Sequence, residues 1–394
     1  MKKEHDNNSE IDLRVERIVA NGYGIGFAEG VTVFVALAAV GDRVRVRVIR
    51  RKKRVAFAEI VEVIEPSPDR VKPRCRHFGV CGGCDLQQMS HSAQLAAKAA
   101  IIRDALKHIA KIDLADDVEV AASRNDLGYR SRARWHADRP ANKIGYYERG
   151  SHDIVDVAEC PILVPSLESK IAELRGGLSE AWNDHFEIDA AEDDDGTISL
   201  YSQEFAEPAA ELVHRTAAGN FRYSAAGFFQ ANKFLIDELT AAAIGDAEGK
   251  LAFDLYCGVG LFTVPLAQRF DRVIGVEENE EAVHFAKRNS ADLTNIEIAA
   301  GRVAAFLAAN AERPDHILLD PPRSGADKGV IEAIVRLRPR TIAYVSCEPS
   351  MLARDLVILC DGGYEIVRIK ALDLFPQTHH IETVVQLSLK GRAP

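Results

Sequence analysis

The chain has 394 residues, of which 47% are hydrophobic and 27% are charged, and this composition indicates an ordinary globular protein of about two or three domains. No apolar run reaches the ~18 residues that a membrane-spanning helix needs, and the polar start Met1–Glu10 lacks a secretory signal. We therefore expect a cytoplasmic protein with no membrane partner. The net charge of −10, taken alone, argues against a nucleic-acid partner.

Residues 11–65 are typical of short strands separated by glycine turns. In Asp42–Ile49 valines alternate with arginines, so a strand there would place valines on one face and arginines on the other. These arginines belong to a dense basic run, Arg43–Arg54, which is an electrostatic footprint for a polyanion even on an acidic protein. The pattern predicts a small β-barrel that presents basic strands to RNA. A solvated charged face is the alternative.

Four of the seven cysteines are spaced like a metal site. Cys75, Cys81 and Cys84 lie close together among glycines that can turn the backbone, and Cys160 supplies a fourth thiolate. An odd number of cysteines without a secretory signal favours metal ligation or catalysis over disulfides. Four thiolates suit either zinc or an iron–sulfur cluster, and the spacing leaves both open. Four protein ligands leave no open iron, so a cluster would be structural or sensory.

Two stretches follow the cysteine cluster. Residues 91–111 have the apolar spacing of a helix with one hydrophobic stripe. Gly128–Trp135 interleaves aromatic residues with arginines, including Arg130 and Arg132, which suits the stacking of bases and the neutralisation of phosphates. The alternative for this second stretch is a strand whose aromatic residues belong to the core.

From about residue 220 strands alternate with helices, which predicts an open parallel α/β sheet. Leu251–Gly260 is an apolar strand that breaks into a glycine turn, and a second strand ends at Glu277. Glycines let the backbone approach a ligand, and a carboxylate at this spacing accepts hydrogen bonds from ribose hydroxyls. The third glycine of the dinucleotide fingerprint is missing, so S-adenosylmethionine fits better than NAD.

Two further strands end in residues that can carry chemistry. Pro321 and Pro322 cannot continue a sheet ladder, so they fix a turn that directs Asp320 toward the carboxyl edge, where open α/β sheets bind ligands. The strand Thr341–Val345 leads to Cys347. That cysteine is either an ordinary buried residue or a nucleophile whose thiolate is activated by its neighbours.

Together these stretches resemble the RNA (uracil-5-)-methyltransferase family, specifically its branch with a TRAM domain and an iron–sulfur cluster that acts on 23S rRNA. The likeness covers nearly the whole chain. Its most specific motifs are Phe228–Asn232, Asp254–Gly260, Asp320–Arg323, Ser346-Cys347 with Pro349, and His380–Glu382. The resemblance implies a TRAM-like (OB-like) β-barrel over residues 1–66, a central mixed α+β iron–sulfur and RNA-binding domain over 67–216, and a class I, Rossmann-like α/β methyltransferase domain over 217–394. The helix at 91–111 could dock on the last of these.

The resemblance also implies roles for single residues. The predicted contacts to S-adenosylmethionine are Gln230, Tyr256, Glu277 and Asp320. The predicted ligands of a 4Fe-4S cluster are Cys75, Cys81, Cys84 and Cys160. Cys347 would be the nucleophile that adds to carbon 6 of a uracil, and Glu382 would be the base that removes the carbon-5 proton. The expected partner is RNA, with 23S rRNA favoured, and the expected state is a monomer.

Two positions depart from the family pattern. Glu348 follows the nucleophile and Leu261 follows the cofactor glycines, where relatives usually or often have Asn. A carboxylate at Glu348 would oppose thiolate formation unless it is turned away or protonated. The alternatives are a tRNA uracil-5 methyltransferase, an RNA methyltransferase for exocyclic amines that needs Asp320 but not Cys347, a radical methylthiotransferase, and an RNA-binding module with a decayed catalytic domain. The cysteine spacing disfavours the radical enzyme, and retention of the whole constellation disfavours the decayed module.

Overall fold

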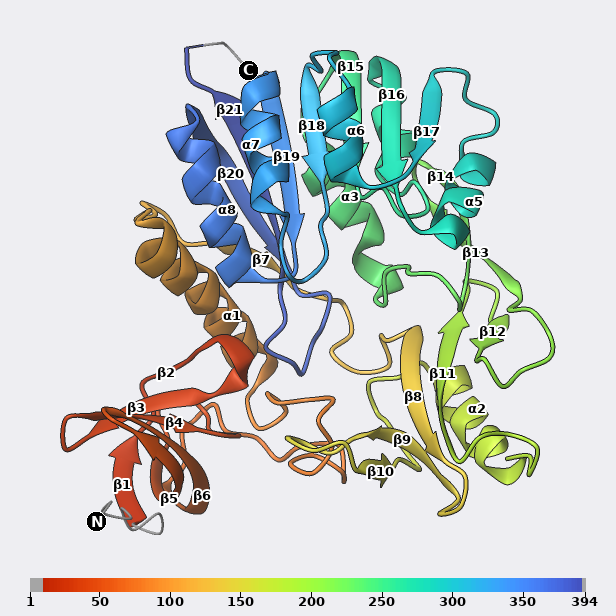
Figure 1. Cartoon of the computed structure of the whole chain (residues 1–394). Coiled ribbons are helices and arrows are strands. Elements are labelled where there is room, and N and C mark those ends of the chain that lie inside the picture. The colour runs from red at the N-terminus through yellow and green to blue at the C-terminus, as the bar shows by residue number, and fades with distance from the viewer. Residues whose placement is uncertain (1–9, 392–394) are drawn as a thin grey trace, which may run out of the picture.

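The computed structural model describes residues 10–391 and arranges them in four sheets, with helices packed on the largest (Figure 1). Most of the polar start Met1–Glu10 lies outside the described residues, as do residues 392–394. Within the described part of the chain no helix is both long enough and apolar enough to cross a membrane.

Residues 10–65 form a six-stranded sheet that curls into a small barrel (Figure 1). In the sheet order β1-β5-β6-β4-β3-β2, the strands are β1 (Glu10–Arg14), β5 (Arg43–Lys52), β6 (Val55–Glu65), β4 (Val31–Val35), β3 (Gly24–Ala28) and β2 (Arg17–Ile18). The alternation predicted for β5 is confirmed, because Val44, Val46 and Val48 are buried in the barrel core while Arg43 and Arg47 are exposed. Successive side chains of a strand point to opposite faces, which explains the pattern.

The central region holds a five-stranded antiparallel sheet, a helix and a separate hairpin. The elements are β8 (Arg132–Asp138), β9 (Lys143–Tyr147), β10 (Ile154–Asp156), α2 (Pro165–Gly176), β11 (His185–Glu192), β12 (Ile198–Tyr201), and the hairpin β13 (Glu211–Thr216) with β14 (Gly219–Ser224). The five strands pair in the order β10-β9-β8-β11-β12. Tyr129 and Trp135 are fully buried in the core of this region. The base-stacking interpretation of these aromatic residues is therefore wrong.

The largest sheet has the strand order β17-β16-β15-β18-β19-β21-β20-β7. Its strands are β7 (Glu119–Ala121), β15 (Gly249–Leu255), β16 (Phe270–Glu277), β17 (Ile296–Ala300), β18 (His316–Leu319), β19 (Thr341–Ser346), β20 (Tyr364–Leu372) and β21 (Glu382–Leu389). The strands from β15 to β19 are parallel, as predicted, and β21 is antiparallel to both of its neighbours. The order reverses between β15 and β18, and open α/β sheets bind ligands at such a switch.

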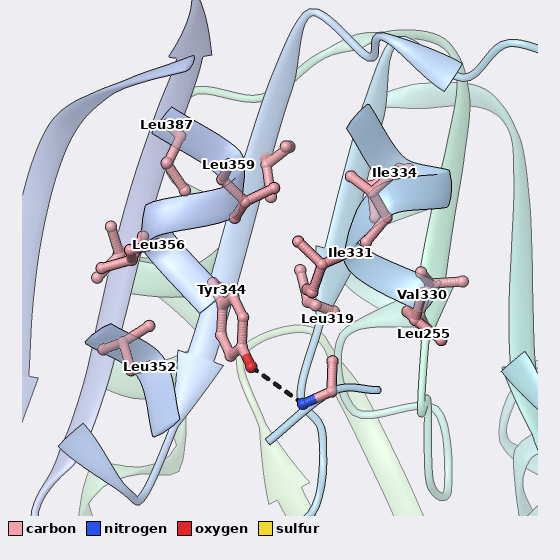
Figure 2. Close-up of a cluster of buried hydrophobic side chains, with 14 of the residues drawn as sticks. Leu255, Leu319, Val330, Ile331, Ile334, Tyr344, Leu352, Leu356, Leu359 and Leu387 are labelled. Atoms are coloured by element: carbon pink, nitrogen blue, oxygen red, sulfur yellow. Dashed lines mark hydrogen bonds between the residues drawn. The ribbon is translucent and has the colours of Figure 1, made fainter. Parts of the chain in front are cut away.

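Helices cover both faces of this sheet. They are α3 (Ile236–Ile244), α4 (Thr263–Leu266), α5 (Glu280–Asn289), α6 (Val303–Ala309), α7 (Lys328–Leu337) and α8 (Pro349–Asp361). Figure 2 shows leucine and isoleucine side chains of α7 and α8 packed around Tyr344 of β19. The Tyr344 hydroxyl donates to Oδ2 of Asp355 at 2.6 Å and accepts from the Ala326 amide at 3.4 Å. The buried phenol is thus fully bonded, and it ties β19 to α8.

Helix α1 (His91–Ala105) continues as one π-helical turn (Leu106–Ala110), so the predicted helix is confirmed. Ile102 and Leu106 pack into the same core as α8, and Figure 1 shows α1 beside α8. Strand β7 pairs with β20 and forms an edge of the largest sheet. Of two elements that precede β8 in the sequence, β7 therefore belongs to the sheet formed by the carboxyl-terminal half, and α1 packs against a helix of that half.

Candidate active site

A cavity of about 640 Å³, here called the active-site cavity, lies at the carboxyl edge of the largest sheet. Every residue predicted to act in catalysis or cofactor binding lines it: Gln230, Tyr256, Glu277, Asp320, Cys347 and Glu382. Four of these follow or end the parallel strands β15, β16, β18 and β19, and parallel strands end at one edge. Because β21 is antiparallel to β19, its first residue lies at this same edge.

The loop after β15 is a tight turn with three residues at positive φ, namely Tyr256 (+64°), Gly258 (+55°) and Gly260 (+89°). A non-glycine residue in this region is uncommon and is concentrated at functional sites. The Gly258 amide donates to Oε2 of Glu277 at 3.0 Å, and Oε1 of Glu277 accepts from the next two backbone amides. The glycine turn and the carboxylate are thus held in a fixed relation beside the cavity.

Asp254, for which no role was predicted, is a buried carboxyl just before this turn. Its Oδ2 accepts from the Thr263 hydroxyl at 2.5 Å, and its Oδ1 has no hydrogen-bond partner among the described residues. Burial raises the pKa of Asp254 to about 7; the bond from Thr263 opposes this shift and the charge of Glu277 adds to it. Asp254 is the first residue of the Asp254–Gly260 motif, and its place in that motif could have identified it as a site residue.

Cys347 follows β19, and its half-buried side chain lines the cavity together with Glu382. Burial, with smaller contributions from the charges of Glu382 and Asp320, raises the pKa of Cys347 to about 12. The positive charge of Arg323 opposes that shift. The thiol is therefore protonated at neutral pH, and its neighbours decide how readily it becomes a thiolate.

Glu382 is only 5% exposed. Burial raises its pKa well above the ordinary value, the charge of Asp320 adds to the shift, and Arg323 opposes it. Burial also raises the pKa of Asp320 to about 7, with a further contribution from Asp254. A buried carboxyl with a raised pKa is suited to exchanging a proton near neutral pH.

Glu348 is not among the residues that line the active-site cavity. It is the N-cap residue of α8, and its Oε1 accepts from the Ser350 hydroxyl at 2.6 Å and from the Ser350 amide at 3.4 Å. Side-chain oxygens at the N-cap satisfy amides that the helix leaves free. The Glu348 carboxylate is thus bonded at the start of α8, and the acidic side chains that raise the pKa of Cys347 are Glu382 and Asp320.

Gln230 lies in a loop, residues 225–232, that the start of β8 holds in place. Arg132 donates to the carbonyl oxygens of Ser224 and Ala225 at 3.1 and 3.2 Å. Its guanidinium is thus bonded to backbone and not available to phosphates, so the prediction that Arg132 contacts RNA is wrong. Instead it helps to hold the loop that presents Gln230 to the cavity.

A second, small cavity, here called the cysteine cavity, lies between β9 and the segment before α1. Its lining includes Cys75, Cys81, Cys84, Cys160, Arg130 and Tyr146. Burial raises the pKa of Cys84 to about 12 and that of Cys160 to about 11. Within residues 10–391 no group of three or more histidine, cysteine or acidic side chains is arranged to hold a metal ion. The four predicted ligands thus share a cavity, and the cluster itself stays a prediction.

Carboxylates of neighbouring strands neutralise much of the basic strand β5. Arg45 pairs with Asp12 at 2.9 Å and with Glu62 at 3.0 Å, and the arginines two residues before and after it also have acidic partners. At the tip of the β5–β6 hairpin, Arg50–Arg54 are exposed. The electrostatic footprint for a polyanion therefore lies at the hairpin tip and not along the strand.

Several known proteins are similar to this chain along nearly its full length. The tRNA (uracil-5-)-methyltransferase family model matches residues 201–315 and 309–390, and the tRNA (uracil(54)-C(5))-methyltransferase TRAM-domain model matches residues 11–68. The 23S rRNA (uracil(1939)-C(5))-methyltransferase RlmD of Methylococcus capsulatus is 34% identical, over 95% of this chain and 96% of its own. An uncharacterised RNA methyltransferase of Thermosynechococcus vestitus is 30% identical, over 96% and 98%. The crystal structure of Pyrococcus abyssi tRNA (uracil-54, C5)-methyltransferase in complex with S-adenosyl-L-homocysteine has a TM-score of 0.74 and 26% identity, over 96% and 100%.

Proposed function

Because this chain belongs to the RNA (uracil-5-)-methyltransferase family, we propose that it methylates carbon 5 of a uridine in 23S rRNA through a covalent bond from Cys347. That the protein is an S-adenosylmethionine-dependent RNA uracil-5 methyltransferase, with the methyltransferase fold and the TRAM domain, follows from the similarities above. The covalent route, the roles of single residues and the choice of rRNA are our proposal. The observation that supports this proposal is that Cys347, Glu382 and Asp320 line one cavity.

S-adenosylmethionine supplies an electrophilic methyl group attached to a positively charged sulfur. We assign its binding to Gln230, Tyr256, Glu277 and Asp320, which line the active-site cavity. The open backbone of the glycine turn suits the close approach of a ligand, and an ionised carboxylate has about four acceptor sites. Glu277 can therefore accept from a ribose hydroxyl in addition to the three backbone amides that it already binds.

Carbon 5 of uracil is a poor nucleophile, so the reaction begins when the Cys347 thiolate adds to carbon 6 and turns the ring into an enolate. Carbon 5 then forms a bond to the methyl carbon as the methyl–sulfur bond breaks. Glu382 removes the carbon-5 proton, the electron pair re-forms the 5,6 double bond, and the carbon–sulfur bond breaks to release Cys347. The uridine must be unstacked for carbon 6 to reach the sulfur.

We propose 23S rRNA as the substrate because the relative named for an rRNA target is 34% identical across nearly the whole chain. A tRNA is the second candidate, since the structure with a TM-score of 0.74 is that of a tRNA methyltransferase. We assign the contact with the RNA backbone to the exposed hairpin tip, Arg50–Arg54, whose positive charge suits phosphates.

We also propose that Cys75, Cys81, Cys84 and Cys160 hold a 4Fe-4S cluster. All four line the cysteine cavity. Four cysteine thiolates are the donor set that a 4Fe-4S cluster takes, and this shared lining is what supports the proposal. Arg130 lines the same cavity and supplies a positive charge opposite the thiolates. With four protein ligands, the contribution of the cluster is to hold the fold.

The division of labour that we propose follows the three expected units. Residues 1–66 bind RNA, residues 67–216 carry the cluster, and residues 217–394 carry the reaction, with α1 and β7 packed on the last unit. We propose a cytoplasmic monomer, and sedimentation of the purified protein at several concentrations tests the oligomeric state.

A trapping assay tests the proposed function. Anaerobically purified protein is mixed with S-adenosylmethionine and 5-fluorouridine-substituted RNA, either a 23S rRNA fragment or tRNA. Fluorine cannot leave carbon 5 as a proton does, so a denaturation-stable adduct should accumulate with the rRNA. Cys347→Ala should form none, whereas Cys360→Ala, which removes a half-buried thiol of α8, should match the wild type.

The assay also separates the alternatives. An adduct that peptide mapping assigns to Cys257, the other thiol of the cavity, would overturn the role of Cys347. Methyl transfer that survives Cys347→Ala would overturn the covalent route. An adduct with tRNA and none with rRNA would identify tRNA, the second candidate, as the substrate.

A further inference from the structure

Glu382 follows a loop, residues 373–380, that α1 and the central region hold in place. In Figure 1 this loop descends from the end of β20 toward α1 and β8. The ammonium group of Lys98 in α1 donates to Oδ1 of Asp373 at 2.5 Å, and both side chains are fully buried. The Tyr129 hydroxyl donates to the carbonyl oxygen of Pro376 at 2.9 Å. The approach of the chain to Glu382 is therefore set by residues far away in the sequence.

Gln377 is the residue through which the segment Asp85–Leu86 holds this loop. Its carbonyl oxygen accepts from the amides of Asp85 and Leu86 at 3.1 and 3.0 Å. Its amide donates to Oε1 of Gln94 at 2.9 Å, and the Gln94 side chain donates back to Oε1 of Gln377 at 3.0 Å. Gln377 is buried at a φ of +69°, a conformation that a non-glycine residue keeps only where surrounding contacts impose it.

The Asp85 carboxylate adds a second link to the same loop. Its Oδ1 accepts from the His379 amide at 2.8 Å, and its Oδ2 lies 2.5 Å from Nδ1 of His379. On its other side the barrel approaches closely, because a Cβ at Gly22 would lie 2.6 Å from Cγ of Asp85. Asp85 is therefore fixed between the barrel and the loop that leads into Glu382.

The residue before Asp85 is Cys84, which lines the cysteine cavity. The Cys84 carbonyl oxygen accepts from the Arg149 guanidinium at 3.0 Å. One peptide bond thus joins Cys84, a proposed cluster ligand, to Asp85, the residue whose carboxylate holds the loop. We propose that Asp85 is a positioning residue that couples the occupied cysteine cavity to the base Glu382. This inference rests on the proposed function, since it takes Glu382 as the base and Cys84 as a cluster ligand.

The coupling should act on one step of the reaction. Cys347 follows β19 and precedes α8, whereas Glu382 comes two residues after the loop that Asp85 holds. Loss of the bonds between Asp85 and His379 would not impair the addition of Cys347 to carbon 6 or the methylation of carbon 5, but it would displace the base Glu382. Removal of the carbon-5 proton would then slow, and the methylated adduct with Cys347 would persist. A displacement of about 1 Å costs on the order of 100-fold in rate.

The test uses full-length Asp85→Ala and His379→Ala proteins, which remove the link from its two ends. Each is incubated with S-adenosylmethionine and an unsubstituted 23S rRNA fragment, denatured, and examined for a protein–RNA adduct, alongside Glu382→Gln. We expect turnover to fall on the order of 100-fold, with an adduct like that of Glu382→Gln and with wild-type iron content. Asp85→Asn retains an acceptor oxygen and should recover part of the rate.

Asp315→Ala is the matched control, because Asp315 accepts from the Lys250 amide at 2.8 Å at the opposite end of the sheet. It should lower stability without forming an adduct. Wild-type turnover in Asp85→Ala and His379→Ala, or slow turnover without an adduct, would overturn the positioning role. Iron-depleted wild-type protein should also accumulate the adduct, and normal turnover without iron would overturn the coupling. If Glu382→Gln accumulates no adduct, the proposed function fails instead.

Discussion

The protein contains two cysteine sites whose thiols look alike by burial alone. Burial raises the pKa of Cys347 and of Cys84 to about 12 in each case. They differ in what lies beside the sulfur. Cys347 opens onto a cavity of about 640 Å³ that also holds Glu382, whereas Cys84 shares a small cavity with three other cysteines. In our proposal, the neighbours of each thiol, and not its burial, therefore distinguish the nucleophile from the metal ligand.

The largest expected effect comes from removing the Cys347 sulfur. Cys347→Ala should slow methyl transfer on the order of 10⁴-fold or more, because the covalent step has no substitute, and iron content should stay that of the wild type. Single-turnover transfer of a labelled methyl group and an iron assay measure the two quantities. An undiminished rate, or a loss of iron, would erase the proposed distinction between the two sites.

The complementary change, Cys84→Ser, should have its main effect on the metal. We expect most of the iron to be lost, since a hydroxyl is a poor ligand for an iron–sulfur cluster. Turnover should fall on the order of 100-fold through the displaced Asp85. The same iron and methyl-transfer assays apply, with Cys360→Ser as the control. Full iron content in Cys84→Ser would remove Cys84 from the ligand set.

The pH dependence should also separate the two sites. Since the pKa of Cys347 is raised to about 12, the reactive thiolate is the minor form at neutral pH and its fraction rises about tenfold per pH unit. The raised pKa of Glu382 acts in the same direction, because a base must first lose its proton. Single-turnover rates should therefore increase with pH, while bound iron should not, since metal-bound thiolates are already deprotonated. A flat rate profile would contradict this assignment.

Much of the active-site cavity could be predicted because its motifs are local. Leu251–Gly260, Asp320 and Cys347 each mark the end of an apolar strand, and a parallel sheet brings such ends to one edge. The orientation of Glu348 was also within reach, because an acid just before Pro349 is a typical start of a helix.

Apart from the role of Asp254, the features that could not be predicted from the sequence depend on contacts between distant residues. An arginine that alternates with core residues can face RNA or backbone, and only the loop at residues 225–232 decides that Arg132 faces backbone. The hydrophobic periodicity of the sequence likewise does not indicate that β7 pairs with β20, or that Gln377 bonds to Asp85. Such pairings need a partner that lies elsewhere in the chain.

The smallest expected effect on methyl transfer comes from Arg130, the cation of the cysteine cavity. Its Nε donates to the Arg132 carbonyl oxygen at 2.9 Å, which fixes the guanidinium beside the sulfurs. Arg130→Met should weaken iron retention about 10- to 100-fold, as the loss of other groups that support metal ligands does, and should change methyl transfer by loaded protein only slightly. Arg130→Lys keeps the positive charge but lacks the planar guanidinium, so its iron retention should lie between those of the wild type and Arg130→Met.

The release of iron to a chelator under anaerobic conditions measures this effect. Equal release from Arg130→Met and wild type would mean that the arginine charge does not stabilise the cluster, and that the packing of the four sulfurs alone defines that site. Faster release from Arg130→Met, with Arg130→Lys in between, would instead show that each cysteine site needs a cation suited to its task. Arg323 would then serve a thiol that must lose its proton transiently, and Arg130 would serve thiolates that stay ionised.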